Sequence, residues 1–176
     1  MKSKTEVKYF DQFSSSTVTA SGVITCITDV TRGTDVTQRV GNQITFKGLD
    51  LKFNAKISGV VGVESQTVRA LLVLDTFGTN APAFTDVLES AFIGSTYTMV
   101  APIYWDYRKR FKILYDRVHT LNTNSNQCET NYHHLKLNIQ SQNIGASTTF
   151  KNQIYLLIVG NETNLLQLPT YWWTLS

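Results

Sequence analysis

Hydrophobic and polar residues alternate along most of the chain, and the clearest case is the stretch from residue 43 to residue 57. Its apolar side chains recur at every second position, with one change of phase at Gly48. A period of two is typical of a strand with one buried face, and a phase change at glycine indicates a β-bulge. The stretch predicts a long strand of an antiparallel sheet, whose apolar residues are Ile44, Phe46, Leu49, Leu51, Phe53, Ala55 and Ile57.

Similar patterns predict the other strands. Alternation from Val18 to Cys26 indicates a first strand that ends near Val30. The almost continuously apolar run from Val68 to Leu74 favours a strand that is buried on both faces. Residues 111–119 alternate with their odd-numbered residues on one face, and a polar hairpin loop at residues 122–126 leads to the next strand. The remaining strands are expected at residues 97–103, 132–139, 154–159 and 171–175.

The number and order of these elements indicate the fold class. Residues 85–89, between Pro82 and Gly94, are the one plausible helix, and strands do not alternate with helices. An immunoglobulin fold is disfavoured, because several strands reach ~10 residues where ~5–6 is usual and no Cys–Trp–Cys core is present. We therefore predict an all-β protein, a single jelly-roll β-sandwich of about eight antiparallel strands with one short helix.

The length of 176 residues fits one domain. Residues 1–16 are polar and are expected to form a flexible lead, and residues 17–176 the jelly-roll domain. Neither a signal peptide nor a run long enough to span a membrane is expected, so no membrane partner is predicted. Cys26 and Cys128 do not form a zinc motif, and Cys26 has the phase of a core residue, which favours a reducing compartment.

One segment combines aromatic and basic residues. Four of the sixteen basic residues lie between Tyr104 and Lys112, although the net charge of +3 is too small to establish nucleic-acid binding. Phosphates bind cationic groups and unstacked bases bind aromatic rings. The candidate nucleic-acid contacts are Arg108, Lys109, Arg110 and Lys112. Alternatively, the aromatic residues pack against a neighbouring subunit and the charges are solvated or paired with Asp106 and Asp116.

The candidate subunit-interface residues are aromatic, because aromatic side chains are enriched in interface cores. They are Tyr104, Trp105, Tyr107, Trp172 and Trp173. Alternation along the last strand sends Trp172 and Trp173 to opposite faces, so that one fills the core and the other meets a neighbour. Lys52 and Lys56 are expected to be plain solvated residues on one strand face.

Five motifs follow one another along roughly residues 20–176: residues 33–34 with 39–44, residues 70–75, residues 82–84 with 87–88, residues 110–116, and residues 152–157. In order and spacing they resemble capsid proteins of small circular Rep-encoding single-stranded DNA viruses, to which the single jelly-roll coats of satellite and small plant RNA viruses are related. The resemblance implies a capsid subunit of the virion, made in the host nucleus or cytoplasm. It also implies a homo-oligomer, an icosahedral shell of about sixty copies around single-stranded nucleic acid, held by head-to-tail contacts that close.

The chain departs from this family at its beginning. Such coats usually start with an arginine-rich arm, whereas this chain has only Lys2, Lys4 and Lys8 there. We expect that the arm has been removed, and nucleic-acid binding by this polypeptide is then expected to be weak.

Two other classes of function remain as alternatives. A jelly-roll lectin would stack sugar rings on exposed aromatic residues. A cupin-type enzyme would need clustered histidines and carboxylates, but His133 and His134 are adjacent and point to opposite strand faces. No nucleophile elbow, metalloprotease or phosphate-loop motif is present. The chain is therefore predicted not to be an enzyme and to use no cofactor or metal, with calcium between subunits left open.

Overall fold

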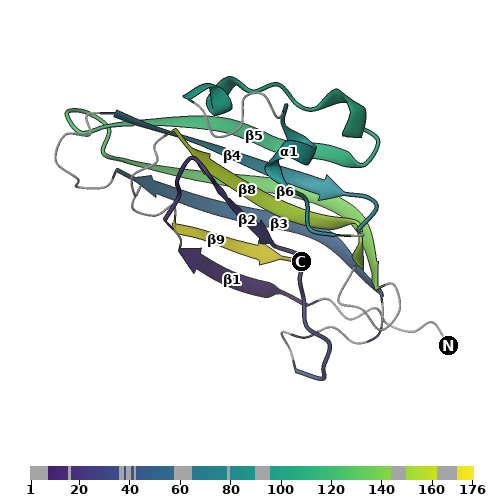
Figure 1. The fold of residues 1–176 in the computed structure, drawn as a ribbon. Coiled ribbons are helices and arrows are strands. Elements are labelled where there is room, and N and C mark those ends of the chain that lie inside the picture. The colour runs from purple at the N-terminus through teal and green to yellow at the C-terminus, as the bar shows by residue number, and fades with distance from the viewer. Residues whose placement is uncertain are drawn as a thin grey trace.

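The computed structural model describes residues 8–15, 17–35, 38, 41, 43–57, 65–78, 80–89, 96–143, 150–161 and 170–176. In this part of the chain, nine strands form two antiparallel sheets (Figure 1). The strands are β1 (Phe10–Ser15), β2 (Val23–Cys26), β3 (Gln43–Lys56), β4 (Ser65–Asp75), β5 (Phe111–Asn122), β6 (Cys128–Asn143), β7 (Phe150–Lys151), β8 (Gln153–Gly160) and β9 (Thr170–Leu175). The helices are α1 (Phe84–Val87) and the 3₁₀ turns η2 (Thr96–Val100) and η3 (Trp105–Tyr107).

The strand order defines a jelly roll. One sheet has the order β1-β9-β3-β6-β7 and the other the order β2-β8-β4-β5. Apart from the two-residue strand β7, the first strand pairs with the last, the second with the next to last, and so on inward to β4 and β5. This is the pairing of one long hairpin rolled into two packed sheets. The predicted all-β jelly-roll sandwich is confirmed.

Strand β3 has the predicted alternation and the predicted bulge. Its pairing with β6 shifts between Phe46 and Gly48. At the bulge the carbonyl of Ser176 accepts hydrogen bonds from the amides of Lys47 and Gly48, and the Ser176 amide donates to the Gly48 carbonyl. The phase change therefore keeps both halves of β3 packed on the core and fastens the end of β9 to it.

The apolar residues form two cores. The first lies between the sheets and contains the inward side chains of β3, β4, β8 and β9, including Leu49, Leu72 and Leu156. The second lies on the outer face of the four-stranded sheet, where the connector between β4 and β5 packs on Leu71 and Val73. Strand β4 is buried on both faces because each face meets one of these cores, as the apolar run from Val68 to Leu74 predicts.

The connector needs a close approach at one glycine. Gly22 has a φ of 70°, and a Cβ atom there would lie 2.4 Å from the Phe84 ring and 2.9 Å from the Ile158 carbonyl oxygen. Glycine at this position allows α1 to pack on the sheet beside β2. The predicted helix at residues 85–89 is present as the single turn Phe84–Val87.

Three sequence-based expectations about elements were wrong. Residues 10–15 are strand β1, not part of a flexible lead, because Phe10 is buried and the strand pairs with β9 along its whole length. The first predicted strand is reduced to Val23–Cys26, since the chain turns at residues 20–21. Residues 96–100 form η2 instead of a strand, and only Ile103 makes a bridge, to Leu88.

Strand β5 also differs from a simple alternation. Its register with β4 shifts between Leu72 and Val73. Because of this shift, Phe111 and Ile113 pack in the outer core, whereas Tyr115 packs on the core between the sheets. In the described residues, no helix combines the length and apolar character that a membrane crossing requires.

Candidate subunit and nucleic-acid interface

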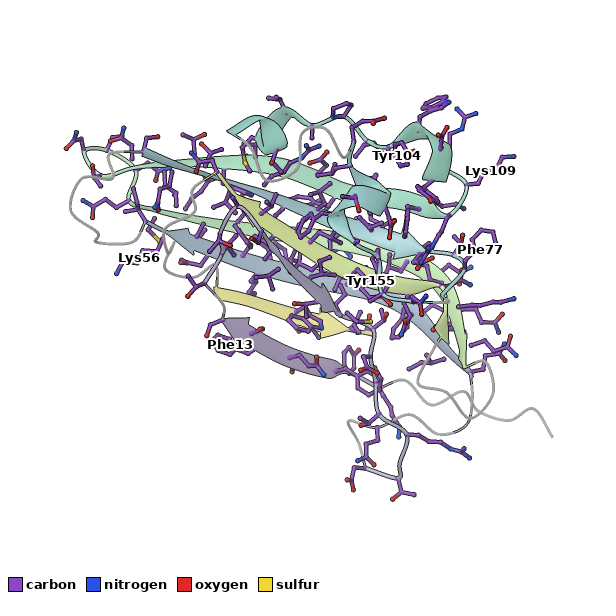
Figure 2. The ribbon with its side chains drawn as sticks, in the orientation of Figure 1. Phe13, Lys56, Phe77, Tyr104, Lys109 and Tyr155 are labelled. Carbon is purple, nitrogen blue, oxygen red and sulfur yellow. The ribbon has the colours of Figure 1, made fainter. Side chains whose placement is uncertain are left out.

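The aromatic and basic residues predicted from the sequence lie in the segment 104–112, which comprises η3, the turn after it and the start of β5. Figure 2 shows Tyr104 and Lys109 beside the helical connector, on the side of the molecule away from Phe13 of β1. The segment is anchored at both ends, because the Tyr104 amide donates to the Val87 carbonyl and the Phe111 ring is buried. Its side chains are therefore presented on a fixed backbone.

Trp105 and Arg108 form one unit on the surface. The Trp105 side chain is 67% exposed, and the guanidinium carbon of Arg108 lies 3.6 Å from the centroid of its ring. Tyr107, also exposed, lies between Tyr104 and Phe111, with centroid distances of 5.2 Å and 6.4 Å. Exposed Trp, Tyr and Arg side chains held in place by stacking are typical of interface anchors. The structure places Tyr104 beside Tyr107 and stacks Trp105 on Arg108, and the role of these residues in a subunit contact stays a prediction.

Arg110 is held by a buried carboxylate. Its Nε and Nη2 atoms donate to Asp75 Oδ1 and Oδ2 at 3.0 Å and 2.8 Å, and Nη2 also donates to the Asn80 carbonyl. Asp75 has no exposed side-chain surface, and its Oδ1 also accepts from the amides of Phe77 and Gly78. The guanidinium of Arg110 is thus a structural group that closes the end of β4, and its charge is compensated by Asp75.

The remaining basic residues of the segment have acidic neighbours. The Asp106 carboxylate raises the pKa of the Tyr104 hydroxyl, and slight burial and the Glu89 carboxylate raise it further. Two carboxylates therefore lie near this surface. The amino groups of Lys109 and Lys112 are exposed and make no ion pair within the described part of the chain. The basic and acidic charges around segment 104–112 therefore nearly balance.

The alternative in which charges of the segment pair with Asp116 is not seen among the described residues. Asp116 instead forms a two-pronged ion pair with Arg69 of β4, at 2.8 Å and 2.7 Å. Arg69 also donates to the carbonyls of Thr98 and Ala101, so it fixes η2 on the sheet. The sequence signal for this ion pair is Arg69 itself, a single charged residue within the apolar run of β4. Arg69 is not among the site residues predicted from the sequence.

Trp173 is a core residue and not an interface residue. Its side chain is 2% exposed, and its Nε1–H donates to the Ile27 carbonyl at 3.0 Å. The side chain of Trp172 lies outside the described residues; its backbone pairs with Phe13 and Lys52. The assignment of Trp173 to a subunit contact is therefore corrected.

The histidines do not form a metal site. His133 is half-buried against the Tyr115 ring, whereas His134 is exposed and binds Asp50. His119 is buried between the sheets, where its Nδ1 lies 2.9 Å from Glu129 Oε1. Within the described residues, no group of three or more histidine, cysteine or acidic side chains is placed to hold a metal ion.

Comparison with known proteins agrees with this structure. Residues 1–167 match the family of the satellite tobacco necrosis virus coat protein. The match covers almost the whole chain, and the chain therefore belongs to this family. A search of curated proteins finds no match.

Family membership defines the class of protein. The chain is a viral coat protein, a structural component of the virion that acts as a subunit of an oligomeric capsid. The resemblance included coat proteins of satellite viruses, and the match agrees with that part of it. The match does not support the link to single-stranded DNA viruses. It agrees with the expectation that the chain is not an enzyme, and it does not favour the lectin alternative.

Proposed function

We propose that the chain assembles into a closed icosahedral shell of about sixty copies that encloses a viral single-stranded nucleic acid. The observation that carries the proposal is the match to a coat protein family over residues 1–167. The jelly-roll sandwich supplies a rigid block whose loops and edges can meet several neighbours at once. Contacts that are individually weak then become cooperative, because each copy is held by more than one neighbour.

Segment 104–112 is the surface that we assign to a contact between copies. Large apolar side chains are exposed in it and in the neighbouring parts of the connector, namely Phe77, Val100, Trp105 and Tyr107. Trp105 and Arg108 stack on each other, so little further ordering is needed when they are buried. Arg108 belongs to this contact in the proposal, whereas Arg110 supports the fold beneath it.

The proposal is tested by the size and contents of the purified protein. Light scattering with negative-stain microscopy is expected to show closed, uniform particles, and the ratio of absorbance at two ultraviolet wavelengths to show enclosed nucleic acid. A monomer or small oligomer over a range of salt concentration and pH, with saturable binding of a glycan, would overturn the proposal in favour of a lectin-like module.

A further inference from the structure

The two sheets differ in what covers their outer faces. The connector between β4 and β5 covers the four-stranded sheet and forms the second core with it. On the five-stranded sheet, by contrast, every second residue of β6 is exposed, and the outward side chains of β3 are exposed or half-buried. Figure 1 shows the helical connector beside β4 and β5, with β1 and β9 on the opposite side of the molecule. We call the outward side of β1, β9, β3 and β6 the open sheet face.

Lysines dominate the charge of the open sheet face. Its exposed lysines are Lys47, Lys52, Lys56 and Lys136. The Lys47 amino group donates to Asn138 Oδ1. The other three have no hydrogen-bond or ion-pair partner among the residues that the structure describes. Within the described residues, no direct hydrogen bond or ion pair therefore occupies these three amino groups, and Lys52 alone of the three has an electrostatic interaction, with Asp50.

The two carboxylates of this face are already bound. Asp50 Oδ1 accepts hydrogen bonds from the Tyr132 hydroxyl and the His134 ring, which lower the pKa of Asp50. Asp11 Oδ1 accepts one from the Thr174 hydroxyl. Both carboxylates keep their charge and offset two of the four lysines, and Lys52 lies close enough to Asp50 to help lower its pKa. The face keeps an excess of positive charge.

Aromatic rings lie on the same face. The Tyr132 side chain is 60% exposed and stands directly opposite Lys52 in the register of β3 and β6. Phe13 of β1 is 58% exposed, and Figure 2 shows it and Lys56 projecting from this sheet, away from Tyr104 and Lys109. A ring beside a lysine on a flat sheet matches the chemistry of single-stranded nucleic acid, in which bases stack and phosphates bind cations.

Charge balance distinguishes the two basic surfaces. In segment 104–112, Arg110 is neutralised by Asp75, and Asp106 and Glu89 lie near the remaining basic residues. The open sheet face has four lysines against two carboxylates that are internally bonded. A polyanion is therefore attracted more strongly to the open sheet face.

We propose that the open sheet face binds single-stranded nucleic acid, with Lys52, Lys56 and Lys136 on phosphates and Tyr132 stacked on a base. The inference rests on the proposed function, because in a closed shell it places the five-stranded sheet on the inner side. It transfers the nucleic-acid contact from Arg108, Lys109, Arg110 and Lys112 to a surface that the sequence interpretation described as plain solvated lysines.

The test is the binding of fluorescein-labelled oligothymidine and oligouridine of about 20 nucleotides to the full-length chain, measured by fluorescence anisotropy as a function of NaCl. The triple variant K52A/K56A/K136A is expected to bind roughly 10- to 100-fold more weakly at low salt. The slope of log affinity against log salt should fall by about 2, since each phosphate contact on a single strand contributes roughly 0.7. The matched variant K109A/K112A is expected to bind like the unchanged chain.

Tyr132 gives a second, independent readout. Y132A is expected to weaken binding roughly tenfold with an unchanged salt slope, because stacking releases no counterions. Y132F keeps the ring and loses only the hydrogen bond to Asp50, so it should bind within about twofold of the unchanged chain. Equal losses in Y132A and Y132F would contradict a stacking role.

The outcomes separate this inference from the proposed function. In one outcome the unchanged chain forms particles, K109A/K112A loses oligonucleotide binding and K52A/K56A/K136A keeps it. The open sheet face is then the wrong binding surface, and the proposed shell is unaffected. A triple variant that alters particle mass and leaves oligonucleotide binding intact would make the face a contact between copies and overturn the inference. If the chain binds through these lysines yet never forms particles, the shell proposal fails and the binding surface stands.

Discussion

The guanidinium of Arg110 forms a bidentate ion pair with the fully buried carboxylate of Asp75, through two hydrogen bonds of 3.0 Å and 2.8 Å. The pair joins the end of β4 to the start of β5, and it also fixes the loop at residues 77–80 through Asn80. Arg110, one of the predicted nucleic-acid contacts, therefore stabilises the backbone that supports the other residues of segment 104–112.

We expect R110A to lower the free energy of unfolding by about 3 kcal/mol, because it leaves the Asp75 carboxylate buried without its charged partner. Urea denaturation followed by tryptophan fluorescence measures the change. R108A is the matched control, since Arg108 is exposed and should change stability by less than about 1 kcal/mol. Equal effects of the two variants would contradict the structural role of Arg110.

Trp173 gives a second prediction about the fold. W173F keeps an aromatic ring in the core but removes the donor to the Ile27 carbonyl, which is left buried and unpaired. The expected loss of stability is about 1–3 kcal/mol. Thermal unfolding by circular dichroism checks it, and W105F, at an exposed position, should unfold like the unchanged chain. A W173F protein as stable as the unchanged chain would show that this hydrogen bond contributes nothing.

The pH dependence of stability is predicted at Glu129. Burial acts to raise the pKa of Glu129, but hydrogen bonds from His119 and Asn131 outweigh it and hold the pKa below its ordinary value. A depressed folded-state pKa stabilises the fold above the unfolded value of about 4.3, and this stabilisation is lost as the pH falls through the folded value. E129Q should therefore be less stable than the unchanged chain at pH 6, and the difference should shrink towards pH 3.

Urea denaturation of both proteins between pH 6 and pH 3 measures that difference. E89Q is the control for a change from carboxyl to amide, because Glu89 has neither of these hydrogen-bond partners. A gap between E129Q and the unchanged chain that stays constant with pH would contradict the account of Glu129.

Trp105 tests the assigned contact between copies. W105A removes a ring that is exposed in the single chain, so the stability of the subunit should change by less than about 0.5 kcal/mol. The concentration needed for particle formation should rise roughly tenfold or more, as for the loss of an interface anchor. Sedimentation velocity over a concentration series measures this, with Y9A, also exposed, as the control. Particle formation by W105A at the same concentration as the unchanged chain would remove segment 104–112 from the interface.

Most of the fold could be predicted from the sequence because its long strands each have a clear apolar pattern. The alternation and the bulge at Gly48 in β3, and the two-sided burial of β4, follow directly from the order of residues. Strand β1 was missed because it is an edge strand with Phe10 as its main buried apolar side chain. A strand of this kind is specified by its partner β9, which lies far away in the sequence.

The candidate site was less predictable, because spacing along the chain does not show which charges meet. Arg110 and Asp75 are 35 residues apart in sequence, and Arg69 and Asp116 are 47 apart. Both pairs depend on the register of β4 and β5, which the periodicity of one strand cannot give. The excess of lysine on the open sheet face depends likewise on the pairing of β3 with β6.

We propose that this coat protein closes into a shell of about sixty copies. The most direct measurement is the mass of single particles of the purified chain by charge-detection mass spectrometry. The account predicts one narrow population at about sixty times the 19.8 kDa of the chain, with extra mass from any enclosed nucleic acid. A protein that remains at the mass of one or a few chains at every concentration and salt condition would contradict it.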